Sequence, residues 1–432
     1  MISPLRIASS EGQARIAALL SRFQEGDDSP LAAVAEILAA VRKRGDDALL
    51  EYCRAFDAPN MTVAGLTARP AEIEAAYQQV DDDFRATLAL AIRRITDFHQ
   101  REIEDSWIQT RADGVVVGRL VRPVDSAGLY VPGGKGGSTP LVSSVLMNGI
   151  PALIAGVPRL VMVTPPDAGG GISPHLLVAA GEIGIKEIYK LGSAWAIAAL
   201  AYGSETVPAV DVIVGPGNQF VAEAKRQVSG RVRIDMIAGP SEVLIIADES
   251  AKCPHVAADM LAQAEHDPQA LAVVITTDKN LASALSDEVR RQLAHLSRRD
   301  IAEKSLADRG CVLIADNIEE AINLANQIAI EHLELMLADP WLWLPKIRHA
   351  GAIFLGGHTP EAAGDYLAGP NHVLPTMGTA RFASALGVDT FVKKSSIISY
   401  SREALMNDAV HIQRLAGLEG LTGHANSVAV RS

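Results

Sequence analysis

The chain has 432 residues, of which 48% are hydrophobic and 21% are charged. This composition is that of a globular protein, and the length exceeds what one hydrophobic core usually supports, so we expect two or more domains. The net charge of −12 and the aromatic content of 4% argue against two nucleic-acid functions, phosphate-backbone binding and base stacking on single strands.

Three cysteines, Cys53, Cys253 and Cys311, are widely spaced along the chain. Their odd number and the lack of a CxxC pair favour neither a disulfide framework nor a zinc ribbon. The N-terminus lacks the basic and apolar regions of a signal peptide, and no run reaches the ~18 apolar residues of a membrane helix. We therefore expect a cytoplasmic protein.

The pattern of the chain changes near residue 114. Residues 11–55 and 70–103 have the apolar spacing of packed helices, whereas short Val/Ile/Leu runs alternate with Ala-rich helical segments from there on. The expected strands are 115–124, 160–164, 187–190, 210–214, 242–246, 271–276, 311–314 and 352–355. This alternation predicts βαβ units with buried parallel sheets. Because one compact sheet cannot hold so many strands, we expect an α/β protein with two doubly wound units, changing over near 130 and near 242.

The stretch Gln263-Ala-Glu-His266 closes an apolar helical run that Pro268 ends. Gln263 and His266 are three residues apart and so share one face of the expected helix. An amide oxygen and an imidazole aimed at one point suit a metal ion or a polar substrate. The alternative is a solvated helix end, with His266 favoured by the helix dipole.

Two glycine-rich loops are candidates for anion binding. Residues 133–138 lie between an expected strand and an expected helix, where backbone amides can face an anion. The second loop, Gly215-Pro-Gly217-Asn-Gln-Phe, lacks the third glycine of the GxGxxG pattern. Tight turns explain both loops as well, and a dinucleotide site here would be non-standard.

Further polar residues stand in apolar or loop surroundings. Glu331 and His332 are adjacent on an expected helix, where they point about 100° apart and can flank one substrate; a helix surface is the alternative. Asp365 and His372 bracket a Gly-Pro turn after the strand at 352–355, where open α/β sheets bind ligands. Ser241 occupies a turn directly before a strand.

Glu419 and His424 lie close to the C-terminus. If the tail is a solvated appendage, these two residues have no functional role. If it folds onto a neighbouring domain or subunit, they can contribute to a site there. The residues alone therefore give four possible oxygen or nitrogen metal ligands, Gln263, His266, Asp365 and His424. The possible substrate or catalytic groups are Ser241, Glu331, His332, His372 and Glu419. Histidine and carboxylate ligands favour zinc or a similar divalent ion.

From about residue 30 to the C-terminus the sequence resembles the histidinol dehydrogenase family. The resemblance rests on several long blocks. They are Asp235-Met-Ile-Ala-Gly-Pro-Ser-Glu-Val-Leu, Gln263-Ala-Glu-His-Asp-Pro, Glu331-His-Leu-Glu-Leu, Gly364-Asp-Tyr-Leu-Ala-Gly-Pro-Asn-His-Val-Leu-Pro-Thr, Gly378-Thr-Ala-Arg-Phe and Glu419-Gly-Leu-Thr-Gly-His.

The resemblance implies a zinc enzyme that oxidises L-histidinol to L-histidine in two NAD-dependent steps. The family's zinc ligands fall on Gln263, His266 and Asp365, with His424 supplied by the other subunit of a homodimer. Its substrate contacts fall on Ser241, His372 and Glu419, its catalytic pair on Glu331 and His332, and its NAD contacts on Tyr130, Asn218 and position 195. Because zinc would hold the substrate, the metal ligands and His332 also count as substrate-binding residues.

The resemblance also implies a fold of two related Rossmann-like domains, with small N- and C-terminal pieces exchanged between subunits. On this basis residues 1–27 form an N-terminal helical segment and residues 387–432 form a tail that completes the partner's active site. Residues 28–129 and 243–386 form the metal and catalytic domain, and residues 130–242 form the NAD domain.

Three positions depart from the family pattern. Trp195 replaces a glutamine that contacts NAD, and an indole can stack on a cofactor ring but cannot reproduce the hydrogen bonds of an amide. The loop at 133–138 is longer than usual, and Ile330 stands where proline is common. The first two favour an alternative, a paralogous zinc- and NAD-dependent dehydrogenase for another amino alcohol or polyol. Trp195 also raises a third possibility, a zinc hydrolase or binding protein without NAD.

Overall fold

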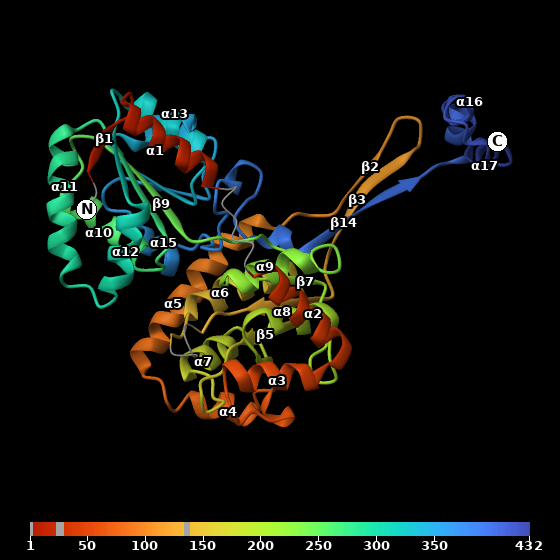
Figure 1. Cartoon of the computed structure of the whole chain (residues 1–432). Helices are drawn as coiled ribbons and strands as arrows, with labels where there is room; N and C mark the ends of the chain where they lie inside the picture. The colour runs from red at the N-terminus through yellow and green to blue at the C-terminus, as the bar shows by residue number, and fades with distance from the viewer. Residues whose placement is uncertain (1–2, 23–29, 134–138) are drawn as a thin grey trace.

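The computed structural model describes residues 3–22, 30–133 and 139–432. Two lobes, each built on a parallel sheet, are joined to an arm that projects away from both (Figure 1). The α/β fold with two doubly wound units is therefore confirmed. Apart from Gly133, the glycine-rich loop at 133–138 lies outside the described residues.

The first lobe contains a six-stranded parallel sheet with the order β1-β11-β10-β9-β12-β13. Its strands are β1 (Pro4–Arg6), β9 (Glu242–Ala247), β10 (Leu271–Thr276), β11 (Cys311–Ile314), β12 (His332–Met336) and β13 (Ala352–Leu355). One face is covered by α1 (Ser10–Ser21) and α13 (Ile318–Ile328), and the other by α10 (Cys253–Ala264), α11 (Lys279–Leu293) and α12 (Arg299–Arg309). The short helices α14 (Pro340–Trp343) and α15 (Glu361–Tyr366) flank β13. Because both faces are covered, β9 and β10 are buried throughout and are almost continuously apolar.

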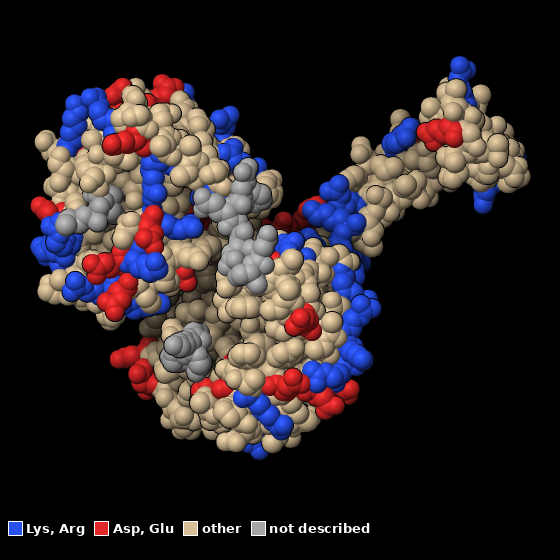
Figure 2. Space-filling view, viewed as in Figure 1, with Lys and Arg blue, Asp and Glu red and all other residues tan. Residues whose placement is uncertain are grey.

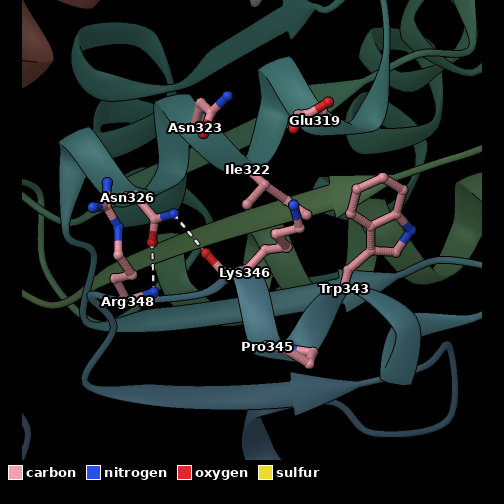
Figure 3. A pocket seen from close by; sticks show the side chains of 8 residues that line it. All are labelled: Glu319, Ile322, Asn323, Asn326, Trp343, Pro345, Lys346 and Arg348. Carbon is pink, nitrogen blue, oxygen red and sulfur yellow. Dashed lines mark hydrogen bonds between the residues drawn. The ribbon is translucent and has the colours of Figure 1, made fainter.

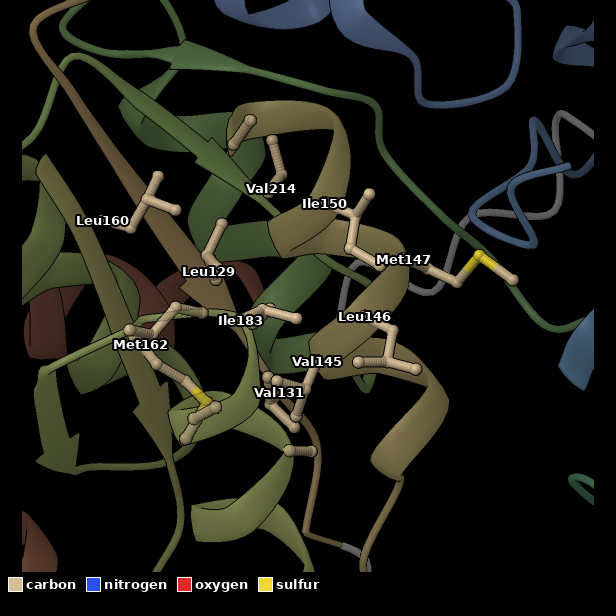
Figure 4. Packing of buried hydrophobic residues seen from close by; sticks show 14 of the residues in the cluster. Leu129, Val131, Val145, Leu146, Met147, Ile150, Leu160, Met162, Ile183 and Val214 are labelled. Atoms are coloured by element: carbon tan, nitrogen blue, oxygen red, sulfur yellow. The ribbon is translucent and has the colours of Figure 1, made fainter. Parts of the chain in front are cut away.

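The second lobe contains a five-stranded parallel sheet with the order β6-β5-β4-β7-β8. Its strands are β4 (Ser126–Tyr130), β5 (Arg159–Thr164), β6 (Glu187–Lys190), β7 (Val212–Val214) and β8 (Arg233–Ile234). One face carries α4 (Pro70–Ala76), α5 (Asp82–His99), α6 (Val142–Ala155) and α7 (Pro174–Glu182), and the other α2 (Leu31–Arg44), α3 (Asp46–Phe56), α8 (Ser193–Tyr202) and α9 (Gln219–Val228). Figure 4 shows the first of these cores, where side chains of β4 and β5 pack against α6.

Apart from the edge strand β1, both lobes have the same strand order. In each, the chain passes from a central strand (β9 or β4) to two strands on one side, and then returns to add two on the other side. The order therefore reverses between β9 and β12 in the first lobe and between β4 and β7 in the second. Doubly wound sheets usually bind ligands at such switch points, outside the carboxyl ends of the strands.

The arm is an antiparallel ribbon that carries two helices. Its strands are β2 (Trp107–Thr110), β3 (Val116–Pro123) and β14 (Val392–Ser399), and its helices are α16 (Arg402–Leu418) and α17 (Thr422–Ala429). Figure 1 places these helices at the far end, away from both lobes. Several large apolar side chains of the arm are more than 60% exposed, namely Ile108, Ile398, Val410, Leu415, Leu418 and Val430. Figure 2 shows that much of this surface carries neither acidic nor basic groups. An exposed apolar surface of this kind is typical of an interface.

The packing divides the chain differently from the sequence analysis. The sequence places residues 28–129 with residues 243–386, whereas α2, α3, α4 and α5 pack on the sheet of the second lobe. Periodicity identifies the apolar side of each helix but not the sheet that it covers. The N-terminal segment also contributes a strand, because β1 pairs with β11 and extends the sheet of the first lobe.

The strand β4 is a second difference in the fold. Ser126–Tyr130 is absent from the expected strands, yet it forms the fully buried central strand of the second lobe. The expected strand at 115–124 exists, but it lies in the antiparallel ribbon of the arm rather than in a parallel sheet.

A buried ion pair fixes the loop that follows β7. Lys225 pairs with Asp235 and donates a hydrogen bond of 2.9 Å to the carbonyl of Gly215, while Asp235 Oδ2 accepts one of 2.8 Å from Gly215 N. The side chains of Lys225 and Asp235 are 2% and 1% exposed. Gly215 has φ +113°, and a Cβ there would lie 2.1 Å from the carbonyl oxygen of Tyr130. The loop therefore closes directly against the end of β4.

Replacing Lys225 by methionine is expected to destabilise the second lobe, because it leaves the buried Asp235 carboxylate without its cation. Breaking such a pair costs about 3–5 kcal/mol, so calorimetry should show a clearly lower unfolding temperature. Lys304→Met is the control, since Lys304 and Asp308 form an exposed pair of the kind worth about 1 kcal/mol or less. Equal unfolding temperatures for the two variants would contradict the role of the buried pair.

Candidate active site

Residues from two neighbouring strands meet at the amino-terminal edge of the first sheet. The parallel register pairs His332 with Val243, so Glu331 stands beside Glu242 at the start of β9. Ser241 directly precedes β9, as the sequence predicted. The expectation that Glu331 and His332 lie on a helix is wrong, because His332 begins β12. Burial in a central strand outweighs the helix propensity of the Glu and Leu residues in this segment.

The main chain of Glu242 contacts both expected catalytic side chains. Glu331 Oε2 accepts a hydrogen bond of 2.7 Å from Glu242 N, and His332 Nδ1 lies 3.0 Å from Glu242 O. Because a carbonyl oxygen only accepts, Nδ1 of His332 carries the proton. His332 Nε2 therefore has a free lone pair, and it is buried without a hydrogen-bond partner among the described residues.

Burial shifts the protonation of this pair in opposite directions. Burial lowers the pKa of His332 to about 3, so the imidazole is neutral at physiological pH. Burial also raises the pKa of Glu331 well above its usual value, and the charges of Glu242 and Asp365 add to this, although the hydrogen bond from Glu242 N opposes it. The imidazole therefore keeps a free lone pair on Nε2 at physiological pH, and the ionised form of Glu331 is more basic than an ordinary carboxylate.

Three side chains beside this pair form a candidate metal site. His266, Glu361 and Asp365 each offer a ligand atom, and these atoms lie within 4.8 Å of one another. Glu361 Oε1 is 3.7 Å from His332 Nδ1, which joins the cluster to the catalytic pair. Gln263 is fully buried, and the acceptor oxygens around its amide assign the nitrogen to the side of Glu361, where it can donate to both carboxylate oxygens at 3.1 and 3.2 Å. The structure thus brings Gln263, His266 and Asp365 together, as the sequence predicted.

The electrostatics of this cluster fit a divalent cation. Burial raises the pKa of Asp365 to about 6. Burial and the charges of Asp365 and Glu331 raise the pKa of Glu361 well above its usual value. Such shifts mean that the ionised carboxylates repel one another in a weakly solvated place, and a bound cation would offset that repulsion. Histidine and carboxylate donors are ligands that zinc accepts.

The local structure of the ligand residues differs from the sequence analysis in two ways. Helix α10 ends at Ala264, so His266 lies just beyond the helix, and it is exposed whereas Gln263 is buried. Asp365 lies on the short helix α15 rather than in a loop. Glu361 was not among the predicted site residues, although its spacing of four residues from Asp365 places both carboxylates on one helical face.

His372 and Ser241 lie where the two lobes join. His372 Nε2 is buried without a hydrogen-bond partner among the described residues, and burial lowers its pKa to about 4. The neighbouring Asn371 donates a hydrogen bond of 2.7 Å to Met147 O in α6 of the second lobe. The charge of His266 contributes to this lowered pKa, so His372 lies near the His266–Glu361–Asp365 cluster while its neighbour Asn371 is attached to the second lobe.

Glu419 and His424 are not part of this cluster within one chain. Glu419 follows α16 and His424 lies in α17, both side chains are exposed, and both helices are at the end of the arm (Figure 1).

The residues expected to contact NAD lie at the carboxyl end of the second sheet. Tyr130 ends β4, and its hydroxyl accepts a hydrogen bond of 3.1 Å from Ser193 N. Asn218 follows β7 and caps α9, its side-chain oxygen accepting from Phe220 N and Val221 N. The two residues therefore flank the switch point between β4 and β7, where a nucleotide is expected.

Trp195 packs inside the second lobe. It is 5% exposed, and Tyr52 and Phe56 of α3 stack on its indole with ring centroids 5.8 and 5.6 Å away. Little of the ring is left for stacking on a cofactor, so that expected contact would require the packing to open.

A separate cavity lies away from these residues. Figure 3 shows it between α13 and the segment at 343–348. Its volume is about 230 Å³. Asn326 connects the two sides. Its side chain donates a hydrogen bond of 2.9 Å to Lys346 O and accepts one of 2.7 Å from Arg348 N. Because these bonds satisfy its amide, the cavity presents no unpaired buried group to a ligand.

Comparisons with known proteins decide the family. A sequence profile described as histidinol dehydrogenase matches residues 20–432. The chain belongs to the histidinol dehydrogenase family. It is 72% identical to the histidinol dehydrogenase of Desulfotalea psychrophila over 431 residues, covering 100% of this chain and 99% of that one. It is 52% identical to that of Thermosynechococcus vestitus, covering 97% of each chain.

A solved histidinol dehydrogenase has the same fold. The structure of the enzyme from Elizabethkingia anophelis matches with a TM-score of 0.91 at 37% identity, covering 100% of this chain and 97% of that chain. The family resemblance expected from the sequence is thus confirmed. None of the helices in the described ranges combines the length and the apolar character needed to cross a bilayer.

Replacing His266 by alanine is expected to weaken binding of a divalent metal by roughly 100-fold or more, because it removes a donor from the cluster. Competition with a chromophoric chelator would measure the affinity. His255→Ala is the control, since His255 lies on α10, the helix that precedes His266, but bonds to Gly357 O outside the cluster. An unchanged affinity in His266→Ala would contradict this assignment of the site.

Proposed function

We propose that the protein oxidises L-histidinol to L-histidine through the aldehyde, reducing two NAD and using one Zn²⁺ per subunit. The observation that carries this proposal is the adjacency of the His266–Glu361–Asp365 cluster to Glu331 and His332. Full-length identity to proteins named histidinol dehydrogenase supports the choice of substrate.

The proposed first step is oxidation of the alcohol. His332 Nε2, which is buried and unpaired, accepts the hydroxyl proton while the carbinol carbon transfers a hydride to NAD. The carbonyl of Glu242 holds the opposite side of the ring, so that Nε2 has a fixed direction. The products of the step are the aldehyde, NADH and a proton.

The proposed second step adds water to the aldehyde and removes a second hydride. Glu331 takes a proton from the attacking water, and its raised pKa makes the carboxylate a stronger base than an ordinary glutamate. Transfer of the second hydride to NAD leaves the carboxylic acid, which ionises.

The remaining residues hold the reactants. Zinc would be held by Gln263, His266, Asp365 and His424 of the partner subunit, and it would orient the polar groups of the substrate rather than take part in hydride transfer. Glu361 fixes the amide of Gln263 and is a further candidate donor. Ser241, His372 and Glu419 are the proposed substrate contacts, and Tyr130 and Asn218 the proposed NAD contacts.

The proposed homodimer gives the arm its role. The exposed apolar side chains of α16 lie on the arm, and the exposed Glu419 and His424 lie close to them. Insertion of this arm between the lobes of a second copy would bury the apolar surface and deliver both polar residues to the partner's site.

The alternative of a paralogous dehydrogenase rested on Trp195 and on the loop at 133–138, most of which lies outside the described residues, and the function without NAD rested on Trp195. Because the indole packs on Tyr52 and Phe56 inside the second lobe, its presence gives no specific reason for another substrate or for loss of the cofactor. The cytoplasmic location stays a prediction, in keeping with Cys53, Cys253 and Cys311, which are free.

The zinc-loaded protein is expected to form two NADH per histidinol consumed, and removal of the metal with a chelator should abolish this activity. Absorbance of NADH measures the rate, and re-addition of zinc should restore it. A protein that is inactive with histidinol but active with another amino alcohol would overturn the proposed substrate.

Two inactive variants are expected to complement each other if the site is shared. His266→Ala and His424→Ala, co-expressed with different affinity tags, form mixed dimers in which one site carries both changes and the other carries neither. Random pairing predicts recovery of about a quarter of the wild-type activity. If the separately purified variants are inactive and the mixed dimers are inactive too, the shared site is excluded.

A further inference from the structure

Arg22, just beyond α1, reaches the base of the catalytic pair. Its side chain is 5% exposed, and its Nε and Nη2 donate to the two carboxylate oxygens of Glu242 at 2.6 and 3.0 Å. Nη2 also donates to Ile328 O at 3.0 Å, and Nη1 to Leu19 O at 2.8 Å. A planar guanidinium holds a carboxylate in one orientation in a way that a lysine cannot.

Glu242 links this arginine to the chemistry. Its side chain bonds to Arg22, while its main-chain N–H and carbonyl bond to Glu331 Oε2 and His332 Nδ1. A single residue therefore holds both catalytic side chains through its main chain. Any rotation of Glu242 would move both contacts together.

The hydrogen bond from Arg22 to Ile328 O holds a second segment beside the catalytic pair. Ile328 is the last residue of α13, and the chain then turns through Ala329, which has φ +52°, to reach Glu331. This left-handed conformation is costly for an alanine and persists only where the surroundings enforce it. Arg22 thus fixes both the strand that supports the catalytic pair and the turn that leads into it.

We propose that Arg22 is a positioning residue for catalysis, and that the N-terminal segment thereby forms part of the active-site scaffold. The proposal rests on the proposed catalytic roles of Glu331 and His332. Arg22 does not touch substrate, cofactor or metal; it acts through Glu242 and the Ile328 carbonyl.

Arg22→Met is expected to lower kcat by roughly 10- to 100-fold, as is typical when a supporting hydrogen-bonded group is lost. The KM for histidinol and the zinc content should stay near those of the wild type. With histidinol deuterated at the alcohol carbon, the isotope effect on kcat should increase, because misplacement slows the hydride step itself. A smaller folded fraction would lower the rate without changing the isotope effect.

Arg15→Met is the matched control. Arg15 lies on α1, and its Nη2 donates to Arg309 O and Gly310 O, away from the catalytic pair. Loss of this anchor should leave kcat and the isotope effect unchanged. Equal losses of kcat in Arg15→Met and Arg22→Met would mean that α1 acts only as structural support, and would overturn the proposal.

Two gentler variants cover the case in which Arg22→Met does not fold. Arg22→Lys keeps the charge without the planar fork, and Glu242→Gln keeps the main chain but weakens the clamp. Lowered kcat with native circular dichroism in these variants supports the proposal, and wild-type kcat in both overturns it. Glu331→Gln separates the proposed catalytic role of Glu331 from the positioning role of Arg22. A fully active Glu331→Gln would overturn the catalytic role. An inactive Glu331→Gln together with a fully active Arg22→Met would overturn the positioning role alone.

Discussion

The parallel register between β9 and β12 is the constraint on which the candidate site depends. It places the start of one central strand beside the start of another, so that Glu242 meets Glu331 and His332 although about 90 residues separate them. Both strands are covered on both faces, so polar groups there must find partners within the protein, at a cost of about 1–3 kcal/mol for each one left unpaired. The main chain of Glu242 and the guanidinium of Arg22 supply those partners. The same few hydrogen bonds therefore stabilise the central strands and orient the side chains of the candidate site.

The same burial concentrates acidic groups. The pKa values of Glu361, Asp365 and Glu331 are all raised, chiefly by burial. A raised folded-state pKa means that the folded protein binds more protons than the unfolded chain, so its stability falls as pH rises through the interval between the two values. For Asp365 that interval runs from the ordinary value of 3.8 to about 6. A bound cation reverses this trend, because it stabilises the ionised form. The site is thus costly for the metal-free chain at neutral pH, as functional sites often are.

Local patterns predicted the fold class and the donor residues, but not the way in which they meet. The spacing of Gln263 and His266 predicted a metal-binding stretch, and the tertiary structure adds Glu361 to the candidate cluster. The segment starting at Glu331 has helix-favouring residues, but it enters a central strand because its neighbours bury it there. Trp195 looked like a cofactor contact by its alignment with the family pattern, whereas its packing on α3 depends on a helix more than 130 residues earlier in the chain. The periodicity of a sequence does not show which distant helices and strands pack against each other.

The geometry of the arm indicates how two copies of the chain would assemble. β14 pairs with β3 along eight residues, from Val392 with Pro123 to Ser399 with Val116, and an antiparallel ribbon of that length spans roughly 27 Å. Its continuous ladder resists folding back, so the ribbon holds Glu419 and His424 away from the cluster of its own chain. Among the described residues, the imidazole nitrogens Nε2 of His332 and His372 are buried beside the candidate site without a hydrogen-bond partner. The arm carries the exposed Glu419 and His424, and the lobes carry these two imidazoles of His332 and His372. The two sets are complementary if the arm of a second copy enters the site. This complementarity is the physical reason for proposing that the catalytic unit is a dimer.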